Sequence, residues 1–266
     1  MATVNEIYAF VDQLAPFSYQ MSFDNAGFLV GRGGRQVTRI LVSLDITEEV
    51  GRGASPWKAE LIDSHDRVIF HPARSVTDQD PTGRILLALA EDGIAAVCAH
   101  TNLDAVAGGV NDALARAVGL TEIEMLQTSG VDENGAPYGI GRVGVLKGKA
   151  VVTLADYAAQ VKTALQANGV RYEDAGRPVR RVAVGGGACG DLMGDALAQG
   201  CDTFITSDVK YNGFLDARAL GLNLIDAGHF PTENVICPVL AERLKRAFPG
   251  LEVRISAVHG EVFSYL

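Results

Sequence analysis

The stretch Ala95-Ala96-Val97-Cys98-Ala99-His100-Thr101-Asn102-Leu103-Asp104 joins a short apolar run to a polar loop. The apolar run predicts a buried strand, and similar runs recur along the chain between segments with helical periodicity. This alternation is typical of an α/β fold with mixed, largely parallel sheets. The other strands that we predict lie at residues 40–45, 67–70, 142–146, 179–184, 203–206 and 223–226.

Two helices are predicted from their capping residues and periodicity. Thr3 and Glu6 have the spacing of a capping box before an amphipathic segment, and Pro16 ends that segment. Thr153 can cap a second helix that carries Asp156 in its first turn. These local signals support the prediction that helices alternate with the strands, as an α/β fold requires.

Composition describes an ordinary globular chain of 266 residues, of which 48% are hydrophobic, so a sizeable core can form. The formal net charge of -9 argues against nucleic acid or an anionic membrane as the main partner. The four cysteines are scattered without C-x-x-C spacing, and no leader or membrane-length apolar run is evident. We therefore expect a cytoplasmic protein with reduced cysteines.

Polar residues follow the predicted strands at the edge where ligands bind in open α/β sheets. His65, Asp104, His229 and Glu233 offer the imidazole and carboxylate groups that divalent transition metals prefer. A bridging carboxylate, Asp104 or Glu233, would allow two ions roughly 3.5–4 Å apart. The alternative is that each histidine is a structural residue with satisfied hydrogen bonds.

Four further groups are open to two interpretations. His71 and Lys210 are candidate catalytic residues that supply charge or contact the substrate, or else they are structural and surface residues. His100 orients its loop in preference to binding metal. The glycine-rich stretch 185–191 lacks the ending of a Walker loop, so a tight strand-to-helix turn is favoured over a phosphate site.

Several long motifs occur in one order: FDNAGFLVG (23–31), HTNLD (100–104), GGVND (108–112), DAGHFPTE (226–233) and VFSY (262–265). With these motifs the whole chain resembles the NGG-interacting-factor-three-like family, whose bacterial members are commonly labelled GTP cyclohydrolase 1 type 2 homologues. The resemblance implies two similar α/β domains, a toroidal homohexamer and a dinuclear metal centre. It implies no established physiological reaction.

The family's metal ligands fall on His65, Asp104, His229 and Glu233, and its fifth ligand falls on Asp66. The family usually has a second histidine at this fifth position, so an oxygen donor replaces a nitrogen donor here. The change favours Mn, Mg or Fe(II) relative to Zn. The resemblance implies two divalent ions per subunit (Mn, Fe, Zn or Mg), or one if Asp66 is too short or pairs with Arg67 instead.

We place the first domain at residues 1–125, completed by about 225–266, and the second at 126–224. Two function classes remain open. One is a metal-dependent hydrolase acting on a nucleotide or another phosphate-bearing small molecule. The other is a non-catalytic metal-binding ring or a scaffold for partners.

Overall fold

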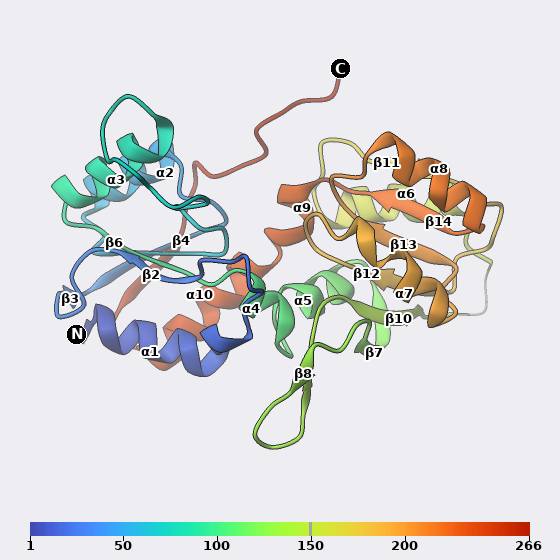
Figure 1. Cartoon of the computed structure of the whole chain (residues 1–266), viewed down its shortest axis with the longest axis horizontal. Coiled ribbons are helices and arrows are strands. Elements are labelled where there is room, and N and C mark those ends of the chain that lie inside the picture. The colour runs from blue at the N-terminus through green and yellow to red at the C-terminus, as the bar shows by residue number, and fades with distance from the viewer. Residues whose placement is uncertain (149–150) are drawn as a thin grey trace. The chain divides into compact units, whose positions relative to one another are not determined.

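The computed structural model describes residues 1–148 and 151–266. These residues fall into two compact units, and each is described by itself below. The first unit comprises Met1–Leu103 and Ile236–Gly260, and the second comprises Asp104–Val235 and Glu261–Leu266. The fold is mixed α/β with mixed, largely parallel sheets, which confirms the predicted class (Figure 1).

The first unit is built on a sheet with the strand order β15-β4-β5-β6-β2, in which β15, β4, β5 and β6 are parallel and β2 is antiparallel to β6. Its elements are β1 (Ala2–Thr3), α1 (Val4–Leu14), η1 (Phe17–Tyr19), β2 (Gly27–Val30), β3 (Gln36–Val37), β4 (Arg39–Ser43), α2 (Glu48–Trp57), β5 (Leu61–Ser64), α3 (Pro81–Glu91), β6 (Ala95–Cys98), α10 (Ile236–Ala247) and β15 (Glu252–Ile255). The short helix α4 (Thr101–Ala105) begins in this unit and ends in the second.

The second unit contains a sheet with the strand order β11-β14-β13-β12-β10-β7. Strands β12, β13 and β14 are parallel, whereas β11, β10 and β7 join the sheet antiparallel. Its elements are α5 (Val110–Ala117), β7 (Leu120–Met125), β8 (Gly130–Val131), β9 (Pro137–Tyr138), β10 (Arg142–Leu146), α6 (Leu154–Ala164), β11 (Arg171–Glu173), β12 (Arg181–Val184), η2 (Gly190–Leu192), α7 (Met193–Ala198), β13 (Thr203–Thr206), α8 (Tyr211–Leu220), β14 (Asn223–Asp226) and α9 (His229–Glu233).

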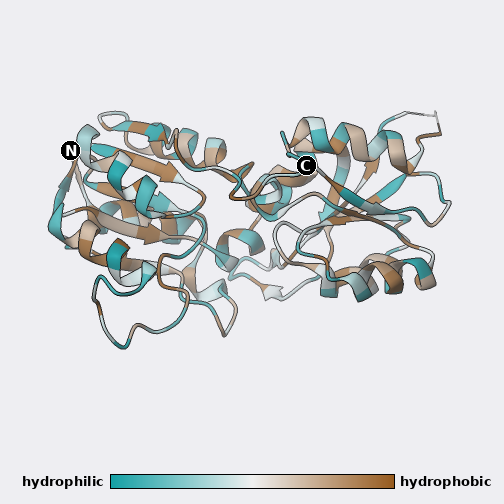
Figure 2. Cartoon of the chain, turned by 90° about the horizontal axis from the view of Figure 1, so that it is seen from above, coloured by the Kyte–Doolittle hydropathy of each residue, from teal (hydrophilic) through white to brown (hydrophobic). Residues whose placement is uncertain are grey.

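Local signals in the sequence placed both predicted helices correctly. Thr3 and Glu6 form a reciprocal capping box at the start of α1. The Thr153 hydroxyl accepts a hydrogen bond from the Asp156 backbone at the start of α6. Hydrophobic residues gather on the strands inside each unit, as the colouring by hydropathy shows (Figure 2).

The strand predicted at residues 67–70 is wrong. The strand lies earlier, at β5, where Leu61 to Ser64 are all fully buried. Arg67 instead turns its side chain into a buried polar cluster, and Phe70 is exposed. The other predicted strands correspond to β4, β6, β10, β12, β13 and β14. The predicted domain limits near 125 and 225 differ from the unit limits, because β7 and β14 both pair within the second sheet.

None of the helices in residues 1–148 and 151–266 combines the length and the apolar composition that crossing a bilayer requires.

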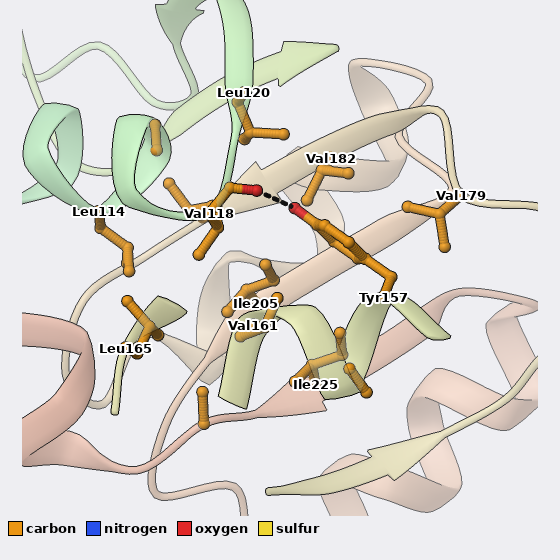
Figure 3. Packing of buried hydrophobic residues seen from close by; sticks show 14 of the residues in the cluster. Leu114, Val118, Leu120, Tyr157, Val161, Leu165, Val179, Val182, Ile205 and Ile225 are labelled. Atoms are coloured by element: carbon orange, nitrogen blue, oxygen red, sulfur yellow. Dashed lines mark hydrogen bonds between the residues drawn. The ribbon is translucent and has the colours of Figure 1, made fainter. Parts of the chain in front are cut away.

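Tyr157 of α6 lies within the core of the second unit (Figure 3). Its side chain is fully buried among valine, leucine and isoleucine residues, and its hydroxyl donates a hydrogen bond of 3.1 Å to the Val118 carbonyl. This bond satisfies two polar groups that would otherwise be buried without partners.

We predict that Tyr157→Phe lowers the free energy of unfolding by about 1–2 kcal/mol, because the Val118 carbonyl loses its donor. Denaturant titration followed by circular dichroism measures the change. Tyr211→Phe is the control, since Tyr211 is 78% exposed and its hydroxyl is not part of the core. Equal stability of the Tyr157→Phe variant and the wild type would contradict the assignment of this bond.

Asp63 is an ionisable residue in the middle of the first sheet. It stands between Val42 and Val97 of the neighbouring strands, and neither of its carboxylate oxygens has a hydrogen-bond partner among the described residues. Burial raises the pKa of Asp63 to about 7. The folded state therefore disfavours the charged form of this side chain.

We predict that the stability of the wild type, relative to that of Asp63→Asn, falls as pH rises from about 4 to 7. The unfolded chain releases the Asp63 proton near pH 4, whereas the folded chain retains it until about pH 7, so ionisation favours unfolding across this window. The loss should be of the order of a few kcal/mol. Unfolding titrations in the presence of a chelator measure it. Asp63→Leu should remove the same pH dependence as Asp63→Asn, and a different pH profile would contradict the assignment to Asp63.

Candidate metal centre

Two histidines of the first unit follow neighbouring parallel strands. His65 comes directly after β5, and His100 follows β6 after one intervening residue. Strands β5 and β6 pair so that Ser64 lies opposite Cys98. Because the carboxyl ends of parallel strands meet at one edge of the sheet, both imidazoles lie at that edge. Their ring centroids are 5.3 Å apart.

His65 is fully buried, and its tautomer is determined by the backbone. The ring Nδ1 lies 2.8 Å from the carbonyl oxygen of Ala99, so this nitrogen carries the proton and donates it. The lone pair of the imidazole is therefore on Nε2. This arrangement, with one ring nitrogen held by a backbone oxygen, is typical of metal-binding histidines.

Asp66 lies beside the two histidines. Its backbone N–H donates to the Leu44 carbonyl, which extends the sheet pairing beyond the end of β5. One ligand atom from each of His65, Asp66 and His100 lies within 4.8 Å of the others, which is close enough for a shared metal ion. The structure thus adds His100 to the candidate ligands, although the sequence favoured an orienting role for it over metal binding.

Arg67 pairs with Asp24 and not with its neighbour Asp66. The Arg67 Nη1 atom lies 3.1 Å from Asp24 Oδ1, and both side chains are almost completely buried. The guanidinium also lies over the Phe70 ring, 4.4 Å from its centroid. The alternative in which Arg67 forms an ion pair with Asp66, so that Asp66 does not bind metal, is therefore not what the structure shows.

Asp24 organises the loop that follows β6. Its Oδ2 accepts hydrogen bonds from the backbone and hydroxyl of Thr101 and lies 2.9 Å from His100 Nδ1. Burial opposes ionisation of Asp24, but the hydrogen bonds from His100 and Thr101 outweigh it and hold the pKa of this carboxyl far below its usual range. Asp24 is therefore a carboxylate at neutral pH.

In the second unit, His229 and Glu233 lie one turn apart on α9. His229 Nε2 is 3.1 Å from Glu233 Oε2, and Glu233 is only 3% exposed. On the other side of the ring, His229 Nδ1 lies 2.6 Å from Asp208 Oδ2. A carboxylate thus holds Nδ1 and directs Nε2 towards Glu233, as in carboxylate–histidine–metal arrangements.

The glycine-rich loop after β12 permits the close approach of Glu233. Gly187 has φ +65°, and a Cβ atom at this position would lie 2.1 Å from Glu233 Oε1. Any larger residue would therefore clash with the proposed ligand. The loop leads into the short helix η2, so the interpretation as a tight turn accounts for these glycines.

Asp104 is a second buried carboxylate of this unit. Burial raises the pKa of the Cys189 thiol, and the negative charges of Asp104 and Glu233 raise it further. Cys189 is therefore a protonated thiol at neutral pH. One carboxylate oxygen of Asp104 lies within 4.8 Å of one of Glu233, so the two buried side chains form an acidic site that suits a cation.

The five predicted ligands thus divide between the units: His65 and Asp66 belong to the first, and Asp104, His229 and Glu233 belong to the second. The predicted catalytic residues His71 and Lys210 are both exposed. The rings of His71 and Phe70 make a T-shaped contact, and Lys210 is the N-cap residue of α8.

A cavity of about 410 Å³ opens beside Asp66 in the first unit. It lies at the carboxyl end of β4 and at the start of α2. The residues that line it include Asp45, Thr47, Glu48, Glu49, Asp66 and Arg67. Most of its charged groups are acidic, so an anionic molecule would bind here only together with cations.

The chain is similar in sequence to one protein family and to several of its named members. A family model described as Duf34/NIF3 (NGG1p interacting factor 3) matches residues 2–261. The chain is 33% identical over 265 residues to a Clostridium perfringens protein named GTP cyclohydrolase 1 type 2 homolog, with 99% of each chain covered. It is 29% identical over 244 residues to a Helicobacter pylori (strain J99) protein named GTP cyclohydrolase 1 type 2, with 92% of each covered.

Solved structures share the fold along the whole chain. A Staphylococcus aureus hypothetical protein superposes with a TM-score of 0.93 at 28% identity, covering 99% of both chains. A Bacillus cereus protein described as related to NIF3 superposes with a TM-score of 0.92 at 24% identity, covering 100% of this chain and 99% of the other. The second likeness concerns the fold alone.

We predict that Arg67→Met lowers the free energy of unfolding by about 3–5 kcal/mol, because it leaves the buried Asp24 carboxylate without its cation. Thermal and urea unfolding measure the loss. The control is Arg52→Met, whose partner Glu48 is at the surface and also binds Arg84. If both variants lost equally little stability, the Asp24–Arg67 pair would not be an important contact of the first unit.

Proposed function

Because the chain belongs to the Duf34/NIF3 (NGG1p interacting factor 3) family, we propose that it is a metal-dependent hydrolase-like protein that acts on a nucleotide or another phosphate-bearing small molecule. One observation carries the proposal. In both units a buried or half-buried histidine donates Nδ1–H to an oxygen, Ala99 O for His65 and Asp208 for His229, and presents Nε2 beside acidic groups.

The proposed ligands are His65, Asp66, Asp104, His229 and Glu233, which would hold two divalent ions. The donor set fits such ions, because it combines two neutral imidazoles with three carboxylates. Asp66 adds an oxygen donor where relatives with a second histidine have nitrogen, which favours Mn, Fe(II) or Mg relative to Zn. When bound, such ions lower the pKa of a coordinated water and polarise a phosphoryl or carbonyl oxygen.

The chain's own residues would perform the remaining tasks. Asp208 and the Ala99 carbonyl orient the two imidazoles, and Gly187 gives Glu233 the space that it needs. The cavity beside Asp66 is of a size that suits a small molecule. Lys210 and His71, whose exposed side chains are able to move, are proposed to supply charge to a phosphate-bearing substrate.

A non-catalytic metal-binding ring is the second candidate. It is favoured by the exposure of both proposed catalytic side chains, since general acids and bases are usually held by packing and by fixed hydrogen bonds. We also propose a toroidal homohexamer as the assembly in either case. Light scattering tests the assembly directly, since a monomer or trimer would exclude it.

We predict about two Mn, Fe or Zn ions per chain in protein that is purified without a metal-affinity tag, as measured by elemental analysis. Glu233→Gln and His229→Ala should each weaken metal binding by at least about tenfold. Losing a residue that only hydrogen-bonds to a metal ligand already has an effect of this size, and these variants remove a ligand itself. Glu252→Gln and His71→Asn are the matched controls, since both residues are exposed.

Unchanged metal content in His229→Ala would exclude this ligand assignment. Activity is a separate readout. Turnover of GTP or of a simple phosphoester that depends on the added ion, and that Glu233→Gln abolishes, would support the hydrolase. Tight metal binding without turnover above that of the metal-free protein would support the metal-binding ring.

A further inference from the structure

His100 has the geometry of a metal ligand, although its position at the start of the HTNLD motif favoured a loop-orienting role over metal binding. It lies at the carboxyl end of β6 beside His65 and Asp66, and a ligand atom of each lies within 4.8 Å of the others. We infer that His100 binds metal, and that His65, Asp66 and His100 form a two-histidine, one-carboxylate site within the first unit. The inference extends the proposed function, with which it shares His65 and Asp66.

The contacts of His100 determine which ring nitrogen faces the metal. Its Nδ1 lies 2.9 Å from Asp24 Oδ2, a carboxylate oxygen that can only accept, so a proton on Nδ1 makes this contact a hydrogen bond. With the proton on Nδ1, the lone pair is on Nε2, the nitrogen that lies 3.4 Å from Asp66 Oδ1. Asp24, His100 and the metal would then form a carboxylate–histidine–metal arrangement, which strengthens an imidazole ligand.

The opposite tautomer satisfies Nδ1 but leaves Nε2–H poorly satisfied. Arg67 Nη1 also lies 2.5 Å from His100 Nδ1, and an unprotonated Nδ1 could accept from it. Nε2–H would then have to donate to Asp66 across 3.4 Å, which is long for a hydrogen bond. In the Nδ1–H tautomer Arg67 cannot donate to Nδ1, and 2.5 Å is too short a distance between two donors. This tautomer therefore requires the Arg67 guanidinium to move away from Nδ1 towards its acceptor Asp24 Oδ1.

Asp66, which stands where the family usually has a second histidine, is a reason to expect that His100 binds metal. An aspartate there removes one imidazole from the set implied by the resemblance, and a ligating His100 restores the nitrogen donor from the neighbouring strand. Two histidines and one carboxylate with open positions suit Fe(II) and related first-row ions. The class of ligand that we assign to the first-unit site is therefore a divalent first-row metal ion, foremost Fe(II).

The test uses the whole chain of 266 residues, loaded anaerobically with one equivalent of Co(II) as a spectroscopic probe in place of Fe(II). Affinity is measured by competition with a chelator, and the number of imidazole ligands by X-ray absorption at the cobalt edge. His100→Asn keeps a side-chain amide that can donate to Asp24 but removes the Nε2 ligand. His71→Asn is the matched control, because His71 is exposed and outside the ligand set.

His100→Asn should weaken Co(II) binding at least about tenfold and lower the imidazole number by one, whereas His71→Asn should change neither. A weaker affinity with an unchanged imidazole number would show that His100 only orients the loop, and this would overturn the inference. Circular dichroism checks the folding of each variant. His100→Gln provides a second test if the Asn variant does not fold.

Restoring the histidine gives an independent test. In the Asp66→His background, His100→Asn should weaken Co(II) binding by a smaller factor than it does in the wild type, because a second nitrogen donor is then present. An equal factor in both backgrounds would overturn the inference.

The outcomes for His100 and for Glu233 separate the two proposals. Loss of metal in Glu233→Gln but not in His100→Asn would leave the proposed function standing and overturn this inference. Loss in His100→Asn but not in Glu233→Gln would support the first-unit site and remove the five-ligand centre.

Discussion

The parallel pairing of β5 with β6 is the constraint on which the chemistry of the first unit depends. It places Ser64 opposite Cys98, so His65, which directly follows β5, and His100, which follows β6 after Ala99, emerge at one edge of the sheet. Backbone contacts then continue past the strand ends, since Ala99 N–H donates to the Ser64 carbonyl. The positions of the imidazoles thus follow from the sheet register and not from a flexible loop.

A buried ion pair supports this edge. Arg67 and Asp24 come from segments that are far apart in the sequence, and both are shielded from water. A buried pair of this kind adds little net stability compared with apolar residues, but removal of one partner is costly. Its contribution here is orientation, because Asp24 also holds Thr101 and His100. In the second unit, Asp208 orients His229 in the same way, through a hydrogen bond with its Nδ1.

The sequence predicted the parts of the structure that depend on neighbouring residues. The capping box of Thr3 and Glu6 and the apolar run of β6 are local patterns, and both are confirmed. Strand β5 was missed because Asp63 interrupts its apolar run, and burial of this carboxyl is set by Val42 and Val97 of the adjacent strands. The strand predicted at 67–70 failed because Arg67 makes its contacts with a distant residue.

By itself, the sequence determined the α/β class, the family and the identity of the candidate ligands, since these depend on residue type, periodicity and motif order. Only the tertiary structure decided which side chains act together. It paired Arg67 with Asp24 in preference to Asp66, and it brought His100 beside His65. The physical reason is that the tautomer of a histidine and the partner of a buried charge are set by contacts across the sheet edge, which separation along the chain does not encode.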